Sequence, residues 1–486
     1  MTRVKSIVAP AWLALGAALA TAAPARADYL AVVGGPAYDQ TAGTGFNGDY
    51  QSLDATDVNN LGVAVGRGYK WQAGVGKGPR AVRWDAAGAW IEWEDLGTNS
   101  QGQTSTGALV INDAGLAAGS ASKYSGTSSR GSRAVRWNSD GTAVELGRLG
   151  LNSSSYTYAV AYDMNEAGTA VGRCRKYNST WQDLGYRAVR WDAGASAATE
   201  LGVLGTDFWG NTSAEALAVN AAGAATGWAT KYVDNDNLGT RAVRWDAGQA
   251  AATELGLVAG GKWADAFDIN DAGAVVGHGA KTVGVGEVLV AIRWDAGGTA
   301  ATELDGLGTP DLIIHVAAAA QKVNNAGTAI GYSKKYIGAI DYGLKGVRWD
   351  AGGSAATELG NLGTRSDGYV LTEACDISDT GTIVGLAEVY QADVLIGTHA
   401  VLWGADARAI DLNSLIAPDS GWTLTGARAI SPNGLWVAGE GLYDPDGDGP
   451  LNPYDRLWLL EVPEPTTAAL MSLGAIALAR RRRRGH

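Results

Sequence analysis

The amino-acid sequence predicts an all-β fold: a closed β-propeller of eight four-stranded blades, with the ring closed by the N-terminal strand. Three observations predict it. A repeat marked by tryptophan occurs eight times, each copy reads as four short strands, and one strand is missing at the end but spare at the start. The tryptophans are Trp84, Trp137, Trp191, Trp245, Trp294, Trp349, Trp403 and Trp458. Their spacings are 53, 54, 54, 49, 55, 54 and 55 residues, a period typical of radial repeat architectures.

The first two strands of each copy are joined by a turn that begins with Asn and has Gly three residues later. In one copy, residues 159–165 and 169–177 read as the two strands on either side of Gly168. The Asn side chain bonds to its own turn, and Gly accepts the positive φ that closes a hairpin. The turns begin at Asn59, Asn112, Asn165, Asn220, Asn270, Asn324, Ser378 and Ser431.

The third strand carries the tryptophan, and a short turn leads from it to a fourth strand that ends in Leu-Gly. Residues 187–192 alternate in type as a pleated strand requires, and residues 198–202 form the fourth strand of the same copy. The leucine of the fourth strand is expected at Leu96, Leu146, Leu201, Leu255, Leu304, Leu359 and Leu412. In the first copy this places the fourth strand at residues 95–97.

The eighth copy lacks a fourth strand, and the N-terminus supplies one. After Trp458 the copy has no Leu-Gly strand, whereas residues 29–35 precede the first turn in the position of a fourth strand. The N-terminal strand is therefore expected to complete the last blade and leave no open edge, which favours a closed ring over an open solenoid. The propeller is expected to span residues 28–461.

The whole repeat resembles the HAF family of bacterial extracellular repeats, in which an Asn-x-x-Gly turn, a Trp strand and a Leu-Gly strand recur. The resemblance covers about Tyr29 to Glu461. Arg-Ala-Val-Arg-Trp stands here where that family usually has His-Ala-Phe-Leu-Trp, and residues 399–403 come closest to the usual form. The resemblance implies an exported, propeller-like protein without shared catalytic residues.

Residues 1–27 have the features of a signal peptide. Arg3 and Lys5 precede an apolar stretch, and small residues stand at Ala25 and Ala27, as a signal peptidase requires. Signal peptidase is therefore an expected partner, and Asp28 is the expected first residue of the mature protein.

Residues 462–486 resemble the PEP-CTERM sorting tail of Gram-negative bacteria. Pro463, Glu464 and Pro465 are followed by an uncharged stretch, residues 466–479, and then by the arginines of residues 480–484. An apolar helix of that length reaches about 21 Å against about 30 Å for a bilayer core, so a transient inner-membrane transmembrane stub is expected. The resemblance implies an exosortase-type sorting enzyme as partner and release to the cell surface or extracellular matrix. An ordinary short membrane tail is the alternative.

Composition and charge narrow the possible partners. The chain has 69 glycines but only 3 phenylalanines, which fits short strands and turns. Without the eight basic residues of the two ends, the formal net charge changes from -12 to -20. Such an acidic body argues against nucleic acid as a partner. Cys174 and Cys375 are too few for a disulfide framework, and we expect them to face each other across the axis, unpaired.

One segment has the spacing of a calcium loop. Carboxylates at positions 1, 3 and 5, an amide at 9 and a carboxylate at 12 follow the twelve-residue pattern, with a backbone carbonyl at 7. The residues are Asp444, Asp446, Asp448, Pro450, Asn452 and Asp455. Calcium is therefore the expected cofactor, bound between the second and third strands of the last blade. An acidic surface turn without metal is the alternative.

Catalytic constellations are poor, so no catalytic residue is assigned. The four histidines, His278, His315, His399 and His486, have no partner at ligand or triad spacing. The repeated Arg and Glu residues, for example Arg190 with Glu200, are expected to pair across neighbouring strands. Carboxylates that converge from separate loops leave an enzyme as an open alternative.

The long variable connections are expected on the face opposite the Asn turns, and they are rich in aromatic residues. Aromatic rings beside carboxylates suit stacking on sugar faces. The candidate ligand-binding residues are Tyr156, Tyr158, Trp181, Tyr186, Phe208, Trp209, Trp263, Tyr369 and Trp422. For any single residue, a role in capping the blade packing is the alternative.

These observations predict an exported, non-enzymatic surface or matrix protein that binds carbohydrate or protein through its loops. A secreted calcium-dependent polysaccharide lyase or hydrolase is the first alternative. A purely structural matrix component is the second.

Overall fold

The computed structural model describes residues 30–39, 44–47, 53–284, 286–308, 317–338, 340–447, 449 and 452–462. The predicted signal peptide, the Pro463 to Pro465 motif and the predicted transmembrane stub lie outside these residues. Within the described part, no helix is long and apolar enough to cross a membrane.

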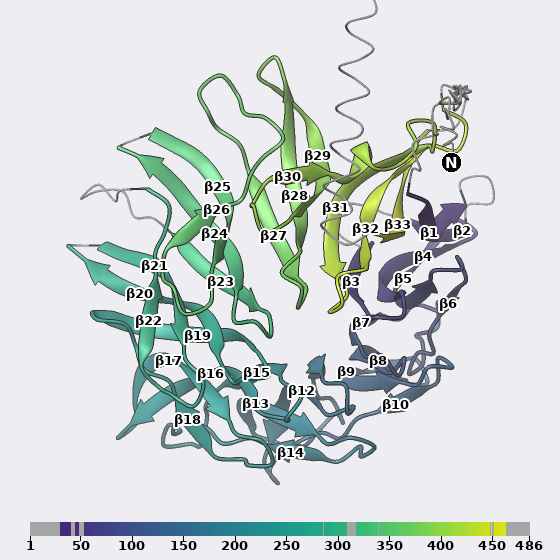
Figure 1. The fold of residues 1–486 in the computed structure, drawn as a ribbon. Coiled ribbons are helices and arrows are strands. Elements are labelled where there is room, and N and C mark those ends of the chain that lie inside the picture. Colours follow the sequence, from purple (N-terminus) through teal and green to yellow (C-terminus); the bar gives the residue numbers. More distant parts are fainter. Residues whose placement is uncertain are drawn as a thin grey trace, which may run out of the picture.

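The described residues form eight antiparallel four-stranded blades in a ring, which confirms the predicted propeller (Figure 1). Blades 1 to 4 consist of β3 (Asp54–Val58), β4 (Val63–Gln72), β5 (Val75–Asp85), β6 (Trp90–Glu92); β7 (Thr106–Ile111), β8 (Ala117–Ser125), β9 (Ser128–Trp137), β10 (Ala143–Glu145); β11 (Ala159–Met164), β12 (Ala170–Tyr177), β13 (Asp183–Trp191), β14 (Ala198–Glu200); and β15 (Ala214–Val219), β16 (Ala225–Val233), β17 (Asp236–Trp245), β18 (Ala252–Glu254).

Blades 5 to 8 consist of β19 (Gly261–Ile269), β20 (Val275–Val283), β21 (Gly286–Trp294), β22 (Ala301–Leu304); β23 (Ala318–Val323), β24 (Ala329–Ile337), β25 (Ile340–Trp349), β26 (Ala356–Glu358); β27 (Thr372–Ile377), β28 (Ile383–Gln391), β29 (Val394–Trp403), β30 (Ala409–Asp411); and β31 (Trp422–Ile430), β32 (Trp436–Tyr443), β33 (Tyr454–Glu461), β1 (Val32–Asp39). The first strand of each blade lies nearest the axis (Figure 1). In the described ranges, the one helical element is the 3-10 turn η1 (Leu412–Ser414).

The ring closes through β1, as predicted. This strand pairs antiparallel with β33, placing Val33 opposite Leu459 and Gly34 opposite Trp458. The short strand β2 (Thr44–Asn47) is an addition that the repeat does not predict, and it joins blades 8 and 1 by pairing with β1 and β4. No blade edge is therefore left open at the junction of the two chain ends.

The repeated tryptophan and the Leu-Gly pair recur together because they form one contact between neighbouring blades. The fully buried Trp191 donates its indole N–H to the Gly147 carbonyl at 3.0 Å, and Trp245 donates to the Gly202 carbonyl at 2.9 Å. At the closure, the indole nitrogens of Trp84 and Trp458 are buried and have no hydrogen-bond partner among the described residues. The fourth strands that precede them, β1 and β30, carry no Leu-Gly pair.

A β-bulge near the end of each described inner strand accounts for a repeated glycine on the second strand. In blade 3 the register shifts between Ala161 and Asp163, opposite Gly172. A Cβ at Gly172 would lie 2.0 Å from the Val160 carbonyl oxygen, so no larger residue fits. The corresponding glycines are Gly66, Gly119, Gly227, Gly277, Gly331, Gly385 and Gly439.

The predicted fourth strand of the first blade, residues 95–97, was wrong. The strand is β6, five residues earlier, in which Glu92 lies opposite Val82. The buried Trp93 takes the place that Leu146 has in the next blade, which hides the Leu-Gly pattern. Leu96 instead forms a parallel bridge with Lys123.

The prediction that Arg190 pairs with Glu200 was also wrong, although ion pairs across strands are present. Glu200 binds Lys176 at 2.7 Å and Arg187 at 3.2 Å, whereas Arg190 binds Asp192 at 2.7 Å. Successive side chains of a strand point to opposite faces, so Arg187 shares a face with Glu200 and Arg190 does not.

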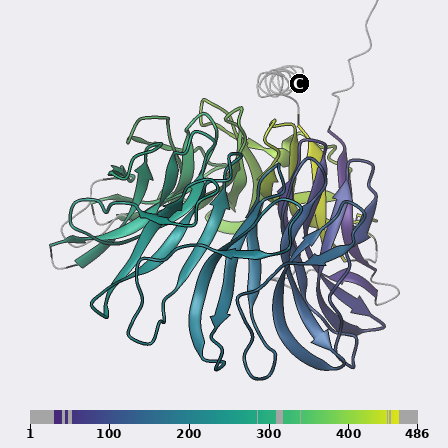
Figure 2. The same ribbon diagram turned by 90° about the horizontal axis from the view of Figure 1, so that it is seen from below.

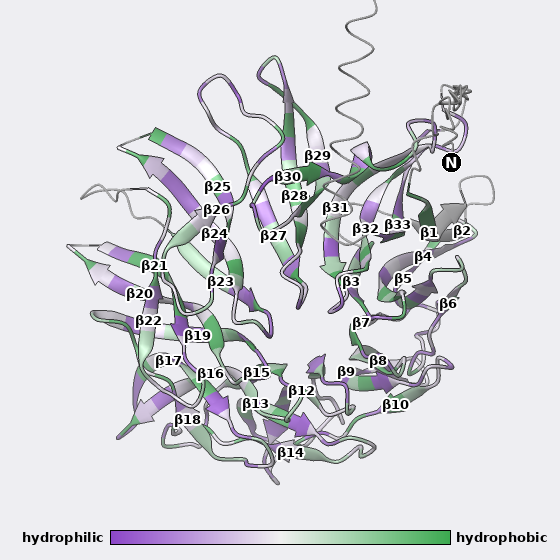
Figure 3. Ribbon diagram, viewed as in Figure 1, coloured by the Kyte–Doolittle hydropathy of each residue, from purple (hydrophilic) through white to green (hydrophobic). Residues whose placement is uncertain are grey.

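The two faces of the ring differ in their connections. Turns between first and second strands, and between third and fourth strands, lie on one side, here called the turn face. Hairpins between second and third strands and the connections between blades lie on the other, the loop face. Figure 2 shows the strands running between these faces, and Figure 3 shows hydrophobic and hydrophilic residues alternating along them.

Candidate functional site

The repeated asparagines close the turn-face end of the central channel. The Asn165 side chain accepts the Thr169 N–H at 3.0 Å and donates to the Asn220 carbonyl at 3.0 Å. Asn220 in turn donates to the Asn270 carbonyl at 3.1 Å. Side-chain amides of the six repeated Asn residues donate hydrogen bonds of this kind to the next blade, so the repeated Asn is a structural residue that links neighbouring blades.

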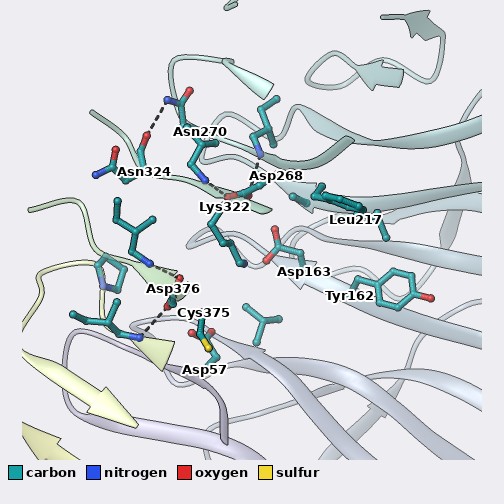
Figure 4. Close-up of a pocket in the computed structure, with 18 of the residues that line it drawn as sticks. Asp57, Tyr162, Asp163, Leu217, Asp268, Asn270, Lys322, Asn324, Cys375 and Asp376 are labelled. Carbon is teal, nitrogen blue, oxygen red and sulfur yellow. Dashed lines mark hydrogen bonds between the residues drawn. The ribbon is translucent and has the colours of Figure 1, made fainter. Parts of the chain in front are cut away.

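A cavity of about 350 Å³ lies on the axis beside this ring of amides. In six of the eight blades both consecutive residues of the bulge line this cavity, for example Cys375 and Asp376. Figure 4 shows side chains from several blades converging on this space. The cavity is therefore lined at two levels, one by each residue of the bulge.

The first level holds carboxylates from alternate blades. They belong to Asp57, Asp163, Asp268 and Asp376. The intervening blades carry Val110, Ala218, Lys322 and Ala429 at the same repeat position. The Asp163 carboxylate accepts the Met164 N–H of its own strand at 2.8 Å and the Val219 N–H of the next blade at 2.7 Å. The other three aspartates make the same pair of bonds, so each joins an odd-numbered blade to its successor.

Charge at this level is unevenly balanced. Burial among the inner strands raises the pKa of Asp57 to about 7, against the opposing effect of the Ile111 N–H. Burial also raises the pKa of Asp163 and Asp376. The charge of Asp268, against the effect of burial, raises the pKa of Lys322, which keeps that amine protonated. The level thus combines one ammonium group with a larger set of carboxyl groups.

The second level, toward the loop face, differs from copy to copy. The bulge residues there are Thr56, Leu109, Tyr162, Leu217, Phe267, Gln321, Cys375 and Arg428. Side chains from second strands pack against several of them, including Arg173, His278 and Glu440. This half of the channel therefore has no eightfold symmetry in its chemistry.

An arginine held among tyrosines lies beside the cavity at blade 3. The Arg173 guanidinium lies 5.7 Å from the ring centroid of Tyr162, 5.2 Å from that of Tyr158 and 4.4 Å from that of Tyr186. It also forms an ion pair with the buried Glu215 of blade 4. Partial burial opposes the charged form, but Glu215 outweighs it and raises the pKa of Arg173.

A histidine–aspartate pair lies at blade 5. His278 Nε2 is 3.7 Å from Asp265 Oδ2, and its ring lies between Trp263 and Phe267 with centroid distances of 5.2 and 4.5 Å. His278 Nδ1 and Asp265 Oδ1 are buried without a hydrogen-bond partner among the described residues.

His399 is also paired, because its Nδ1 lies 2.8 Å from Asp411 Oδ2. In both cases the partner comes from a neighbouring strand, where spacing along the sequence does not show it. His315 and His486 lie outside the described residues. In the described part, no group of three or more His, Cys, Asp or Glu side chains is arranged to hold a metal ion.

The two cysteines are unpaired, as predicted, but they do not face each other. Cys375 lines the cavity, where its Sγ lies 3.7 Å from Arg428 Nη1, whereas Cys174 is packed in the core between blades 2 and 3. Burial raises the pKa of Cys375 to about 12 and that of Cys174 to about 11, so both are thiols at neutral pH. The prediction placed the two cysteines at equivalent positions of their blades. Cys375 instead lies in the bulge of the inner strand β27, whereas Cys174 lies in the second strand β12.

The predicted calcium loop joins β32 to β33, the second and third strands of blade 8. Asp444 accepts the Asp446 N–H at 3.3 Å, and Asp455 lies in β33 opposite Leu442. Asp448 and Pro450 lie outside the described residues.

The predicted ligand-binding aromatics fall into separate groups on the loop face. Six of the nine belong to blade 3 and its two flanking connections. These six are Tyr156, Tyr158, Trp181, Tyr186, Phe208 and Trp209. Of the rest, Trp263 packs against His278, Tyr369 lies 5.4 Å from the Arg365 guanidinium, and Trp422 packs against Tyr443.

The channel residues themselves were missed at the sequence level. Their signal is present in the repeat, because aligning the copies on the turn Asn places Asp two residues earlier in alternate copies. The residue three positions before the Asn differs from copy to copy, and this variation also indicates a channel position. Neither residue stands out from a single copy, where each reads as part of an ordinary strand.

Fold and site together define a closed eight-bladed propeller with a uniform turn face and a chemically varied channel. Residues 461–484 match the PEP-CTERM protein-sorting motif, which confirms the predicted tail. The motif is the recognition signal of an exosortase-type sorting enzyme, so this is an exported protein. No curated protein sequence matches the chain. The resemblance of the repeats to HAF repeats stays a prediction.

Several solved propellers are similar in overall shape. The propeller domain of the trilobed protease from Pyrococcus furiosus is 11% identical, with a TM-score of 0.39, over 71% of this chain and 90% of that one. An oligogalacturonate lyase in complex with manganese is 11% identical, with a TM-score of 0.37, over 72% and 87%. An ulvan lyase is 9% identical, with a TM-score of 0.38, over 76% and 98%. Likenesses this distant carry no argument about function.

Proposed function

We propose that this exported protein is a non-enzymatic binding module of the cell surface or extracellular matrix, and that it binds carbohydrate in the loop-face half of its channel. The observation that carries the proposal is the divergence of the copies. At one repeat position the channel presents Tyr162, Phe267, Gln321 and Arg428, while six of the eight turns on the turn face begin with the same Asn. A symmetric scaffold forms without this variety of side chains. A binding site for a ligand without eightfold symmetry requires it.

The chemistry of the cavity supports a sugar. Aromatic rings pack against the C–H faces of sugar rings, and charged side chains bond to hydroxyl groups. Phe267 and the Arg428–Glu440 pair, joined at 2.6 Å, offer both kinds of contact. A recess of about 350 Å³ is within the size range of small-ligand sites. These features favour a sugar chain over a flat protein surface as the ligand.

A lyase or hydrolase is the second candidate, and one observation favours it. His278 and Asp265 form an acid–base pair beside the cavity-lining Phe267, and one nitrogen and one oxygen of the pair have no hydrogen-bond partner among the residues that the structure describes. General acid–base catalysis requires a group of this kind within reach of the substrate. Product formation therefore has to be measured together with binding.

Glycan-array binding of the full chain tests the proposal, followed by calorimetry on each hit. Phe267→Ala is expected to weaken binding about tenfold or more, because it removes a cavity-lining ring. Leu61→Ala is the matched control, since Leu61 is an exposed apolar residue on the turn face.

The products decide between the candidates. Release of reducing ends or unsaturated sugars would replace the binding function by the enzymatic one. The absence of any glycan binding would leave a purely structural matrix component.

Calcium stays a proposed ligand of the β32–β33 loop. Calorimetric titration is expected to find one saturable site that Asp444→Ala with Asp446→Ala removes, because both carboxylates occupy early positions of the loop pattern. A wild-type chain that takes up no calcium would reduce the segment to a surface turn.

A further inference from the structure

Blade 3 departs from its sister blades at the tip of its loop-face hairpin. The turn between β12 and β13 has five residues, 178–182, whereas the corresponding turns of blades 1, 2, 4 and 7 have two. Its fourth residue is Trp181, which is 62% exposed and has a φ of +62°. This left-handed conformation costs a bulky residue roughly 1–2 kcal/mol.

The same five-residue turn occurs in connections between blades, which allows a comparison within the chain. In each turn the first N–H donates to the fifth carbonyl, and the fourth N–H donates to the first carbonyl. These turns begin at Asn99, Asn152, Asp207 and Arg365. Their fourth residues are Gly102, Ser155, Gly210 and Gly368. Trp181 thus occupies a position that otherwise carries Gly or Ser.

The turn that follows blade 3 is unusual in its second and third residues. These are Phe208 and Trp209, which are 80% and 67% exposed, with ring centroids 5.9 Å apart. The sister turns carry Ser100 with Gln101, Ser153 with Ser154, and Ser366 with Asp367. The turn itself does not require aromatic residues.

Hydrogen bonds hold the backbone of the turn that carries these rings. The Asp207 carboxylate accepts the Trp209 N–H at 2.9 Å and the Asn211 N–H at 2.7 Å. The buried Arg187 donates to the Gly210 carbonyl at 2.9 Å. Rigid aromatic side chains bind with little loss of conformational entropy.

Trp181 stands on the neighbouring loop. The Leu184 carbonyl accepts the Thr212 N–H of the connection at 3.2 Å, and Leu184 follows Trp181 by three residues, which span at most about 10 Å. The exposed rings of Trp181, Phe208 and Trp209 therefore belong to adjoining loops, the hairpin of blade 3 and the connection that follows that blade.

A line of stacked side chains joins this region to the channel. Tyr162 lines the cavity and contacts Arg173, whose guanidinium lies over the Tyr186 ring. Arg175 lies 5.0 Å from the same ring centroid and pairs with Asp183 at the start of β13. Contacts thus continue from the cavity to the hairpin that carries Trp181.

We propose that blade 3 carries an extended binding track for a linear, uncharged polysaccharide, running from the cavity along β12 to the rings of Trp181, Phe208 and Trp209. The inference rests on the proposed carbohydrate-binding function and names the ligand class. A linear chain fits because the rings and the cavity are separate points along one blade.

The charges on and around the track favour an uncharged chain. Arg173 and Arg175 are both neutralised, by Glu215 and Asp183. The acidic body of the protein repels polyanions.

Affinity electrophoresis and calorimetry of the full chain with xylan and cellohexaose, and with alginate as the anionic comparison, test the track. The variant Trp181→Gly, Phe208→Ser, Trp209→Gln takes its residues from the sister turns, so it is expected to fold normally. Leu395→Thr with Ile396→Thr is the matched control, because these are exposed aliphatic residues on the hairpin of blade 7.

We expect the blade 3 variant to bind the neutral chain at least about tenfold more weakly, and the control to bind as the wild type does. A neutral chain that binds the variant and the wild type equally would overturn the track and leave the channel site in place. Preference for alginate would overturn the ligand class. Binding of no glycan by the wild type would instead overturn the proposed function itself.

Discussion

The two ends of the channel are built from the same eight copies, yet only one end repeats its chemistry. On the turn face, Asn165, Asn220 and Asn270 make the same bonds to their own turn and to the next blade. Toward the loop face, the corresponding positions hold residues as different as Tyr162 and Gln321. Comparing the copies within one chain thus separates residues that the ring needs from residues that it does not.

The largest loss of stability is expected at a position where all eight copies carry the same residue. Gly227→Ala would place a Cβ 2.0 Å from the Glu215 carbonyl oxygen in the bulge of blade 4. We expect a loss of about 3 kcal/mol or more in the free energy of unfolding, measured by urea denaturation, because backbone atoms must move.

The matched control for this variant is Gly248→Ala. Gly248 has a φ of +70° but no atom within 4 Å of an added Cβ, so a loss of about 1 kcal/mol is expected. Equal losses in the two variants would contradict the account of the bulge.

A smaller effect is expected from the ring of amides. Asn220→Ala removes the acceptor of the Ala224 N–H and the donor to the Asn270 carbonyl at a buried site. The expected loss is about 2–3 kcal/mol in the same measurement. The exposed Asn237 on the loop face serves as the control, and its substitution by Ala is expected to cost under about 1 kcal/mol.

The carboxyl groups of alternate blades make stability depend on pH. Asp57 has a pKa of about 7 in the fold and 3.8 as its ordinary value. Between these values the native state holds a proton that the unfolded state has released, so the free energy of unfolding falls as the pH rises from about 4 to about 7. Asp57→Asn is expected to make this slope shallower in urea titrations at stepped pH. A slope that stays the same would contradict the raised pKa.

The smallest change in the free energy of unfolding, and one of opposite sign, is expected at a position where the copies differ. Trp181→Gly relieves a positive φ at an exposed turn, so stability should be unchanged or rise by up to about 1 kcal/mol. Loss of stability would show that Trp181 supports the fold and would remove the contrast between the two faces.

The repeat predicts the fold well because its strongest signals are structural. The Trp84 to Trp458 period and the N-terminal spare strand correctly predicted the blades and the closure. The fourth strand of blade 1 was misplaced because Trp93 stands where copies 2 to 7 have a leucine. The channel was missed because residues such as Asp163 meet their partners only after the ring has formed, across blades far apart in the sequence. The loop aromatics were identified by composition, but which of them are packed and which exposed depends on contacts such as that of Trp263 with His278.

The pairing of β1 with β33 has a consequence for the order of events during folding. Val33 and Leu459 are partners, so one of the first strands to be synthesised must wait for one of the last. Contacts this distant in sequence form slowly, and until then β1 and the last blade present unpaired edges. The ring therefore closes only after nearly the whole chain has been synthesised, and an unfinished chain needs protection from aggregation.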